Sequence, residues 1–187
     1  HPDRVTALVL RGIFTLRTSE LAWMYERGHL EHVYPDHWAA FVAPVDPARR
    51  HEMQAAYHDL LFDPDPAVHV PAARAWSEWE ARIIAVRPDE EEISRTVEPR
   101  HAVAFARIEN HYFVHGGWLE EGQLLRDAPR LRHIPGVIVQ GRYDACTPVR
   151  SAWDLHRAWP EADWRLVPDA GHAWLEPGIL RELRAAT

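Results

Sequence analysis

The sequence predicts an α/β fold in which a long helical segment interrupts a parallel sheet. Residues 118–187 alternate between helical and strand patterns, which is typical of a parallel sheet. Residues 5–10 form a short apolar run rich in strand-forming residues and indicate an earlier buried strand. Only helical patterns lie between them. We therefore expect a sheet part at 1–17, a helical segment at 18–115 and a second sheet part at 116–187.

The helical segment should contain several helices separated by clear breaks. The first begins at Thr18 or Ser19, either of which can cap a helix. Further helices are expected at residues 37–41, 48–61, 70–84 and 102–113. The sequence DPDP at 63–66 is a breaker, and the acid-rich stretch from residue 87 to 99 suits a surface loop or a helix start.

The second sheet part should contain two strands and three helices. We expect strands at 136–140 and 164–167, and helices at 119–132, 151–159 and 177–186. The last helix carries a proline in its first turn, where the missing amide hydrogen costs nothing.

Composition excludes several classes of protein. All 21 basic residues are Arg, and 28 acids give a net charge of −7, which argues against a generic nucleic-acid binder. No apolar run is long enough to suggest a membrane span, and no signal-peptide pattern is present, so we expect a cytoplasmic protein. A single Cys rules out an intramolecular disulfide and a zinc cluster. We expect no metal and no cofactor.

Two titratable residues follow two neighbouring strands of the predicted sheet. Asp144 comes shortly after the strand at 136–140, and His172 comes shortly after the strand at 164–167. Open α/β sheets place their sites at the carboxyl ends of such strands. An Asp that accepts the imidazole Nδ1–H would fix the tautomer and let the His act as a general base. Taken singly, each could be only a cap or a turn residue.

A nucleophile for this pair is expected outside the chain. In α/β-hydrolases the chain order is nucleophile, acid, His. The four serines do not occur in a G-x-S-x-G sequence; they are Ser19, Ser77, Ser94 and Ser151. We therefore expect the nucleophile upstream of His1, and we expect the 187-residue chain by itself to be inactive.

Several stretches together resemble the proline iminopeptidases, also called prolyl aminopeptidases. They are VTALVLRGIF (5–14), WSEWE (76–80), ARIENHYF (106–113), PGVIVQGRYD (135–144), SAWDL (151–155) and AGH (170–172). The resemblance implies a C-terminal part of an α/β-hydrolase fold with an inserted helical cap. It also implies a serine peptidase that releases N-terminal proline from peptides. Asp144 and His172 would be the acid and base of its triad.

The resemblance implies further site residues. Glu80 and Glu109 would bind the free amino terminus of the substrate, and paired carboxylates suit an ammonium group. Residues 18–112 carry 9 Arg against 17 Asp and Glu, so this part of the chain also holds the excess negative charge. Arg11, Phe14 and Tyr25 match the stretch around the proline pocket. The alternative is that the two glutamates face solvent or pair with arginines, and that the aromatic residues are ordinary core.

One departure from the family pattern lies close to the triad acid. The family commonly carries a Cys three residues after that acid, where this chain has Thr147 and places its thiol at Cys146. Two other functions stay open. One is another capped α/β-hydrolase, such as an esterase, epoxide hydrolase or dehalogenase; the other is a non-catalytic binding protein on the same fold. The oligomeric state is not predicted.

Overall fold

The computed structural model describes residues 1–187 and divides into two compact units. The first unit contains residues 1–20, 84–86 and 120–187, and the second contains residues 21–83 and 87–119. The first unit holds all the strands, and the second is helical. The predicted fold class, a parallel α/β sheet interrupted in sequence by a helical segment, is confirmed.

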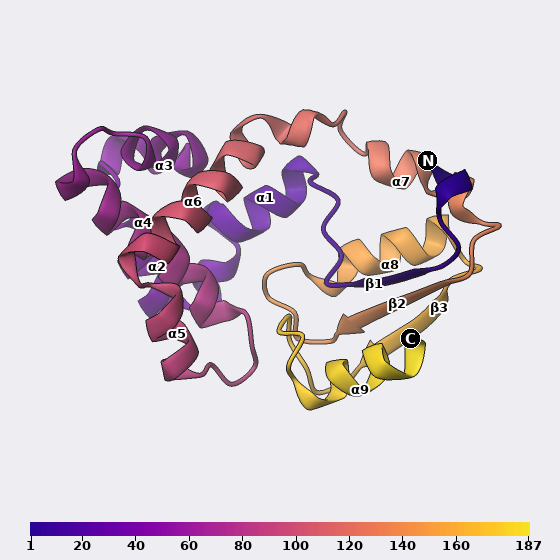
Figure 1. The fold of residues 1–187 in the computed structure, drawn as a ribbon. Helices are drawn as coiled ribbons and strands as arrows, with labels where there is room; N and C mark the ends of the chain where they lie inside the picture. The colour runs from indigo at the N-terminus through magenta and orange to yellow at the C-terminus, as the bar shows by residue number, and fades with distance from the viewer. The chain divides into compact units, whose positions relative to one another are not determined.

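The first unit is built on a three-stranded parallel sheet in the order β1-β2-β3 (Figure 1). The strands are β1 (Leu8–Arg11), β2 (Gly136–Gly141) and β3 (Asp163–Val167). β1 begins later than its apolar sequence predicts, because Leu8, opposite Gly136, is the first residue of this run that pairs with β2. It is also less buried than predicted, with Val9 37% exposed, since β1 pairs only with β2 in this chain.

Helices cover both faces of this sheet. α8 (Val149–Ala158) packs on one face of β2, and α9 (Pro177–Ala186) packs on the other (Figure 1). Side chains alternate across the strand, so Ile138 joins the cluster around Trp159 while Val139 joins Ile179 and Val167. Both clusters are almost fully buried and hold the strand ends in fixed positions.

The helix predicted at 119–132 is the main error in this unit. The structure has a short helix, α7 (Gln123–Asp127), followed by a 3₁₀ turn at Ala128–Leu131. Gly122 adopts a left-handed conformation before α7, and Pro129 lies in the turn after it. Both residues shorten the helix that the amphipathic pattern alone suggests.

The second unit is helical throughout, as the sequence predicts. It contains most of α1 (Thr18–Tyr25), then α2 (Pro35–Val42), α3 (Met53–Leu61), α4 (Pro66–Ile83), α5 (Glu90–Thr96) and α6 (Pro99–Val114). Three of these helices start with proline in the first turn. α4 therefore begins inside the predicted breaker and continues through Pro71. No helix of the chain is long and apolar enough to cross a membrane.

Aromatic packing forms the core of the second unit. The rings of Tyr25, Phe41, Tyr57, Trp76 and Trp79 are each at most 1% exposed. Tyr25 stacks on Trp76 with ring centroids 4.6 Å apart, and Phe41 stacks on Tyr57 at 4.9 Å. This cluster fixes the positions of α1, α2, α3 and α4, and it places two hydrogen-bond donors beside the glutamates described below.

Candidate active site

A carboxylate and an imidazole meet at the carboxyl ends of β2 and β3. Asp144 lies in the turn after β2, and His172 lies in the loop after β3. His172 Nδ1 is 2.9 Å from Asp144 Oδ2. The Asp144 side chain is 1% exposed, whereas that of His172 is 18% exposed. The acid is therefore buried behind the imidazole, and the imidazole remains accessible.

Asp144 is held by a set of donors that leaves little freedom to its carboxylate. Oδ1 accepts a hydrogen bond from the Thr147 backbone N–H at 2.7 Å. Oδ2 accepts from Gln140 Nε2 at 2.9 Å and from Thr147 Oγ1 at 3.0 Å, in addition to its contact with His172. A carboxylate oxygen accepts hydrogen bonds, and each of these partners offers it a donor.

Gln140 connects this turn to the first strand. Its side chain is fully buried at the end of β2, where its Oε1 accepts from the Ile13 backbone N–H at 3.2 Å. Its Nε2 also donates to the Thr147 carbonyl at 3.0 Å. One amide side chain therefore joins the segment after β1 to the turn that carries Asp144.

The backbone of His172 is fixed independently of its ring. The amides of His172 and Ala173 both donate to the Ile84 carbonyl, at 2.9 and 2.8 Å. The His172 carbonyl accepts from Arg11 Nη1. Gly12 lies against the ring: a Cβ there would be 2.7 Å from His172 Cε1, and its φ of +57° is one that glycine adopts readily. These contacts limit both the position of the ring and its rotation.

The geometry supports acid–base chemistry at His172. An Nδ1–H directed at Asp144 leaves the lone pair of the neutral imidazole on Nε2. That nitrogen can take a proton from a hydroxyl nucleophile, and Asp144 stabilises the resulting imidazolium. The arrangement is the one that the acid and the base of a catalytic triad adopt.

The thiol of Cys146 lies beside this pair. Ligand atoms of Asp144, Cys146 and His172 all lie within 4.8 Å of one another, and Cys146 is 8% exposed. Thiolate, imidazole and carboxylate form a ligand set that can bind a divalent metal such as zinc. The Nδ1 atom of His172 is already engaged by Asp144, which reduces the fit. The expectation that no metal is required stays a prediction.

In the second unit the structure brings Glu80 and Glu109 together. Glu80 is on α4 and Glu109 on α6, and their carboxyl groups hydrogen-bond to each other. Tyr25 Oη donates to Glu80 Oε1 at 2.5 Å, and Trp76 Nε1 donates to Glu109 Oε2 at 2.8 Å. Both glutamates are half-buried.

Two arginines that lie close to these glutamates in the sequence, Arg82 and Arg107, bind other groups. Arg82 binds Glu78 and Glu90 instead, and Arg107 Nε donates to the Leu61 carbonyl at 2.7 Å. The two carboxyl groups therefore face each other with neutral donors around them.

Their environment favours a proton shared between the two carboxyl groups. Burial, and then the charge of Glu109, raise the pKa of Glu80 well above its ordinary value. Burial also raises the pKa of Glu109, while hydrogen bonds from Glu80 and Trp76 lower it. Two carboxylates in contact cannot both ionise without a cation nearby. The pair is thus suited to receive a positively charged group in place of its proton.

The remaining predicted site residues occupy different surroundings. Arg11 is engaged by the His172 carbonyl, and Phe14 is half-buried in the first unit. Tyr25 belongs to the aromatic core of the second unit and donates to Glu80. Their assignment to a proline pocket stays a prediction.

Sequence reasoning missed four residues that hold the site: Gln140, Thr147, Ile84 and Trp76. Gln140 offered a signal, since a polar amide inside an apolar strand indicates a buried hydrogen-bonding role. Thr147 was visible only as a departure from a family pattern. Ile84 acts through its backbone carbonyl, which no sequence pattern reveals.

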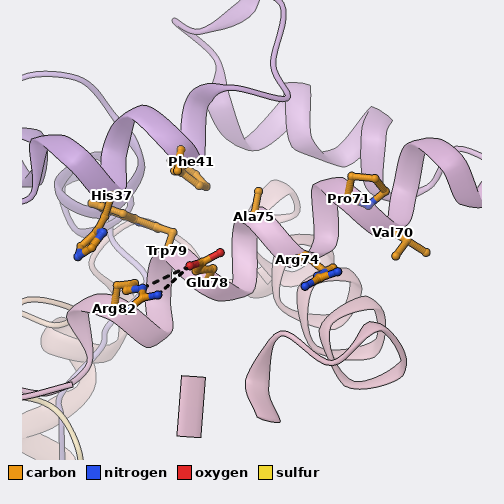
Figure 2. A pocket seen from close by; sticks show the side chains of 10 residues that line it. His37, Phe41, Val70, Pro71, Arg74, Ala75, Glu78, Trp79 and Arg82 are labelled. Atoms are coloured by element: carbon orange, nitrogen blue, oxygen red, sulfur yellow. Dashed lines mark hydrogen bonds and ion pairs between the residues drawn. The ribbon is translucent and has the colours of Figure 1, made fainter. Parts of the chain in front are cut away.

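A hollow of about 370 Å³ lies elsewhere, along α2 and α4 of the second unit. Figure 2 shows its lining, with Arg82 bonded to Glu78 across one side. Arg82 also donates a hydrogen bond to Glu90, which raises the pKa of the guanidinium, and its positive charge is compensated by the two carboxylates. Glu80, Glu109 and the Asp144–His172 pair are not among the lining residues. We assign no function to this hollow.

The parallel sheet, the inserted helical unit and the Asp–His pair at the strand ends match the pattern expected for a part of an α/β-hydrolase fold. The chain is a homologue of the proline iminopeptidases along its whole length, as its motifs predicted. It is 48% identical over 188 residues to the proline iminopeptidase of Xylella fastidiosa strain 9a5c, covering 100% of the chain and 60% of that protein. With the Neisseria gonorrhoeae protein of the same name it shares 49% identity over 180 residues, covering 96% of the chain and 56% of the relative.

The relatives include a plant protein. The Arabidopsis thaliana proline iminopeptidase is 47% identical over 188 residues, covering 100% of the chain and 49% of the relative. The chain thus spans about half to 60% of the length of these relatives. No family model matches. A solved structure of an esterase from Thermogutta terrifontis, with malate bound, matches 75% of this chain and 48% of the esterase chain. The sequence identity is 19% and the TM-score is 0.44, so this likeness supports no conclusion about the chain.

Proposed function

We propose that the whole protein is a serine aminopeptidase that releases proline from the N-terminus of peptides. The observation that carries this proposal is the half-buried pair Glu80 and Glu109, which contact each other and have no arginine partner. Simple ester or epoxide hydrolysis has no need of such a pair. The names of the relatives support the same activity.

The pair suits the N-terminus of a prolyl peptide. A prolyl amino terminus is a secondary ammonium with two N–H donors and one positive charge. Two carboxylates can each accept one of these hydrogen bonds, and charge-assisted bonds of this kind are stronger than neutral ones. Binding at this position would stop the enzyme after one residue, because the peptide cannot slide further into the site.

His172 and Asp144 supply the chemistry in this proposal. A serine from a segment ahead of His1 attacks the prolyl carbonyl while His172 Nε2 takes its proton. His172 then donates that proton to the leaving amine, and Asp144 stabilises the imidazolium throughout. Water, activated by the same His172, releases proline from the acyl-enzyme. The chain by itself holds no such serine elbow, so the 187 residues alone would be inactive.

Two alternative functions would use different residues of the chain. Another capped hydrolase would use Asp144 and His172 but not the glutamate pair. A non-catalytic binding protein would use neither the Asp–His geometry nor a nucleophile. The short contact between Asp144 and His172, at 2.9 Å, favours an enzyme.

Three substrates given to the whole protein test the proposal. We expect rapid hydrolysis of a prolyl arylamide and little hydrolysis of the N-acetyl-prolyl arylamide, because acetylation removes the ammonium. A simple p-nitrophenyl ester measures the hydrolytic centre without the anchor. Equal rates on the free and acetylated prolyl substrates, or ester hydrolysis alone, would contradict the aminopeptidase assignment.

A further inference from the structure

The side chain of Thr147 contacts both members of the Asp–His pair. Its Oγ1 is 3.0 Å from Asp144 Oδ2 and 3.1 Å from His172 Nδ1. Thr147 is 8% exposed, so water competes little for these contacts. Its hydroxyl lies within hydrogen-bond distance of both the acid and the base.

We propose that Thr147 is a positioning residue whose hydroxyl fixes the orientation of the His172 imidazole relative to Asp144. This proposal rests on the proposed function for the reaction in which His172 acts as the base. The contacts of Thr147 do not depend on it. The hydroxyl proton goes to Asp144 Oδ2, since that oxygen can only accept. The oxygen lone pairs of Thr147 then face the His172 Nδ1–H, which is shared between two acceptors.

The backbone and the side chain of Thr147 have separate tasks. The backbone N–H donates to Asp144 Oδ1 at 2.7 Å and holds the carboxylate whatever side chain is present. Gln140 Nε2 holds Oδ2 as well, at 2.9 Å. Removing the hydroxyl should therefore leave Asp144 in place and affect chiefly the second acceptor for His172.

Two acceptors constrain the imidazole more than one. With Asp144 alone, the ring can rock about its single hydrogen bond. With Oγ1 beside Oδ2, a rotation of the ring weakens two contacts at once. Nε2 is thereby held in one direction, and small losses of alignment at a proton-transferring atom lower the rate of the chemical step.

A hydroxyl is well suited to this position. It donates and accepts at ordinary hydrogen-bond lengths, whereas a thiol is a weak donor and a weak acceptor. Thr147→Ser keeps the hydroxyl, Thr147→Val keeps the shape without it, and Thr147→Cys provides a thiol. These variants separate hydrogen bonding from packing.

The test measures kcat and KM of the whole protein on a prolyl arylamide. We expect Thr147→Val to lower kcat about 10-fold with KM changed less than twofold, because the hydroxyl touches the base and not the substrate. Thr147→Ser should restore kcat to within about threefold of the parent, and Thr147→Cys should fall between Ser and Val. A Thr147→Val enzyme with unchanged kcat would overturn the proposal, as would a Thr147→Ser enzyme as slow as the Val variant.

The chain offers a matched control in Thr15. This buried threonine also donates its hydroxyl to a buried carboxylate, that of Glu20, at 2.9 Å. Thr15→Val should lower the thermal unfolding midpoint about as much as Thr147→Val while leaving kcat within twofold. If Thr15→Val lowered kcat as strongly, the effect at Thr147 would reflect general destabilisation, and the positioning role would be wrong.

A fluorophosphonate probe separates failure of this proposal from failure of the proposed function. The serine oxygen attacks phosphorus, fluoride leaves, and the hydroxyl proton passes to His172, so labelling needs the triad but no peptide specificity. If the parent labels rapidly yet cleaves no prolyl substrate, the substrate assignment fails. The ratio of labelling rates between the parent and Thr147→Val, again expected near 10, still decides the role of Thr147.

Discussion

His172 is held at its backbone, its ring edge and its Nδ1 atom by different residues. Ile84 accepts from its amide, Gly12 lies against its ring, and Asp144 accepts from Nδ1. Because these contacts are independent, a substitution at one of them should alter the chemistry without unfolding the loop. The acid is the contact that most directly controls the tautomer.

Asp144→Asn in the whole protein should nearly abolish turnover. An amide keeps the shape but supports the wrong imidazole tautomer, and in serine proteases this change costs about 10⁴-fold in kcat. His172→Ala should be at least as severe. Steady-state kinetics on a prolyl arylamide measures both. Substantial activity in Asp144→Asn would mean that another carboxylate serves as the acid.

Glu80→Gln and Glu109→Gln should change specificity more than the hydrolytic chemistry. Each removes one charge from the pair but keeps its shape. Hydrogen bonds to charged groups contribute roughly 1.5–3 kcal/mol, so kcat/KM on prolyl substrates should fall about 10- to 150-fold. Hydrolysis of an uncharged ester should change little. Equal losses on both substrates would assign the glutamates to support of the helical unit.

The same pair should make stability depend on pH. The pKa of Glu80 is raised in the folded state, so the folded protein holds more protons than the unfolded chain above the ordinary value of 4.5. Its contribution to stability is present below that value and is lost as pH rises through the raised pKa. Glu80→Gln should therefore unfold at a higher temperature than the parent near neutral pH, and the difference should shrink at pH 4. Thermal melts at both pH values measure this, and a difference that did not change with pH would contradict the shared proton.

At the scale of single residues, sequence alone located part of the site. Asp144 and His172 followed from their places after two strands, which physical reasoning can anticipate. Glu80 and Glu109 are 29 positions apart on different helices, and only a family resemblance singled them out. The Thr147 contacts depend on a turn whose geometry no spacing rule supplies.

Among the elements, the end of β2 and the turn after it pack closely against the loop after β3. A Cβ at Gly141 would lie 2.0 Å from the Gly171 carbonyl oxygen and 2.6 Å from that of Ala170. Both contacts are to backbone, which cannot move aside as a flexible side chain can. The turn with Asp144 and the loop with His172 therefore approach each other closely because Gly141 has no side chain.

Gly141→Ala should destabilise the first unit and reduce activity together. Overpacking of this kind typically costs about 1–3 kcal/mol, and here the strain falls on the loop that carries His172. Gly122→Ala is the control, since its Cβ would meet nothing within 4 Å and only its positive φ is strained. Thermal unfolding and kcat measured on both variants test this. Gly141→Ala with normal stability and kcat would show that the two loops can separate without loss.

The start of a helix could be predicted from the sequence where one residue type, proline, determines it. Other element boundaries could not. Proline starts three helices, although α4 begins four residues before the periodic pattern suggested. The predicted helix at 48–61 divides into a 3₁₀ turn and α3. Apolar periodicity reports which face is buried, but it does not report where the backbone leaves the helical conformation.

For the whole molecule, the sequence predicted a parallel sheet and a helical segment because their hydrophobic periods differ. It did not reveal that residues 84–86 group with the first unit. The contact responsible joins the Ile84 carbonyl to the His172 amide, 88 positions later in the chain. A backbone contact between residues so far apart in the sequence cannot be predicted from composition or from the spacing of residue types.

The register of the sheet has a consequence for how the molecule folds. Leu8 pairs with Gly136, so β1 meets β2 only after the chain has closed a loop of 128 residues. For a disordered chain, that closure costs about 4 kcal/mol beyond the fixed cost of any loop. Pairings of such high contact order form slowly, whereas the helices between them need only local contacts. In the whole protein, pulsed hydrogen exchange during refolding should therefore protect amides of α4 and α6 before those of β1. Protection of β1 first would mean that the sheet organises the helices, and the protein would then form its Asp144–His172 pair before its helical unit rather than after it.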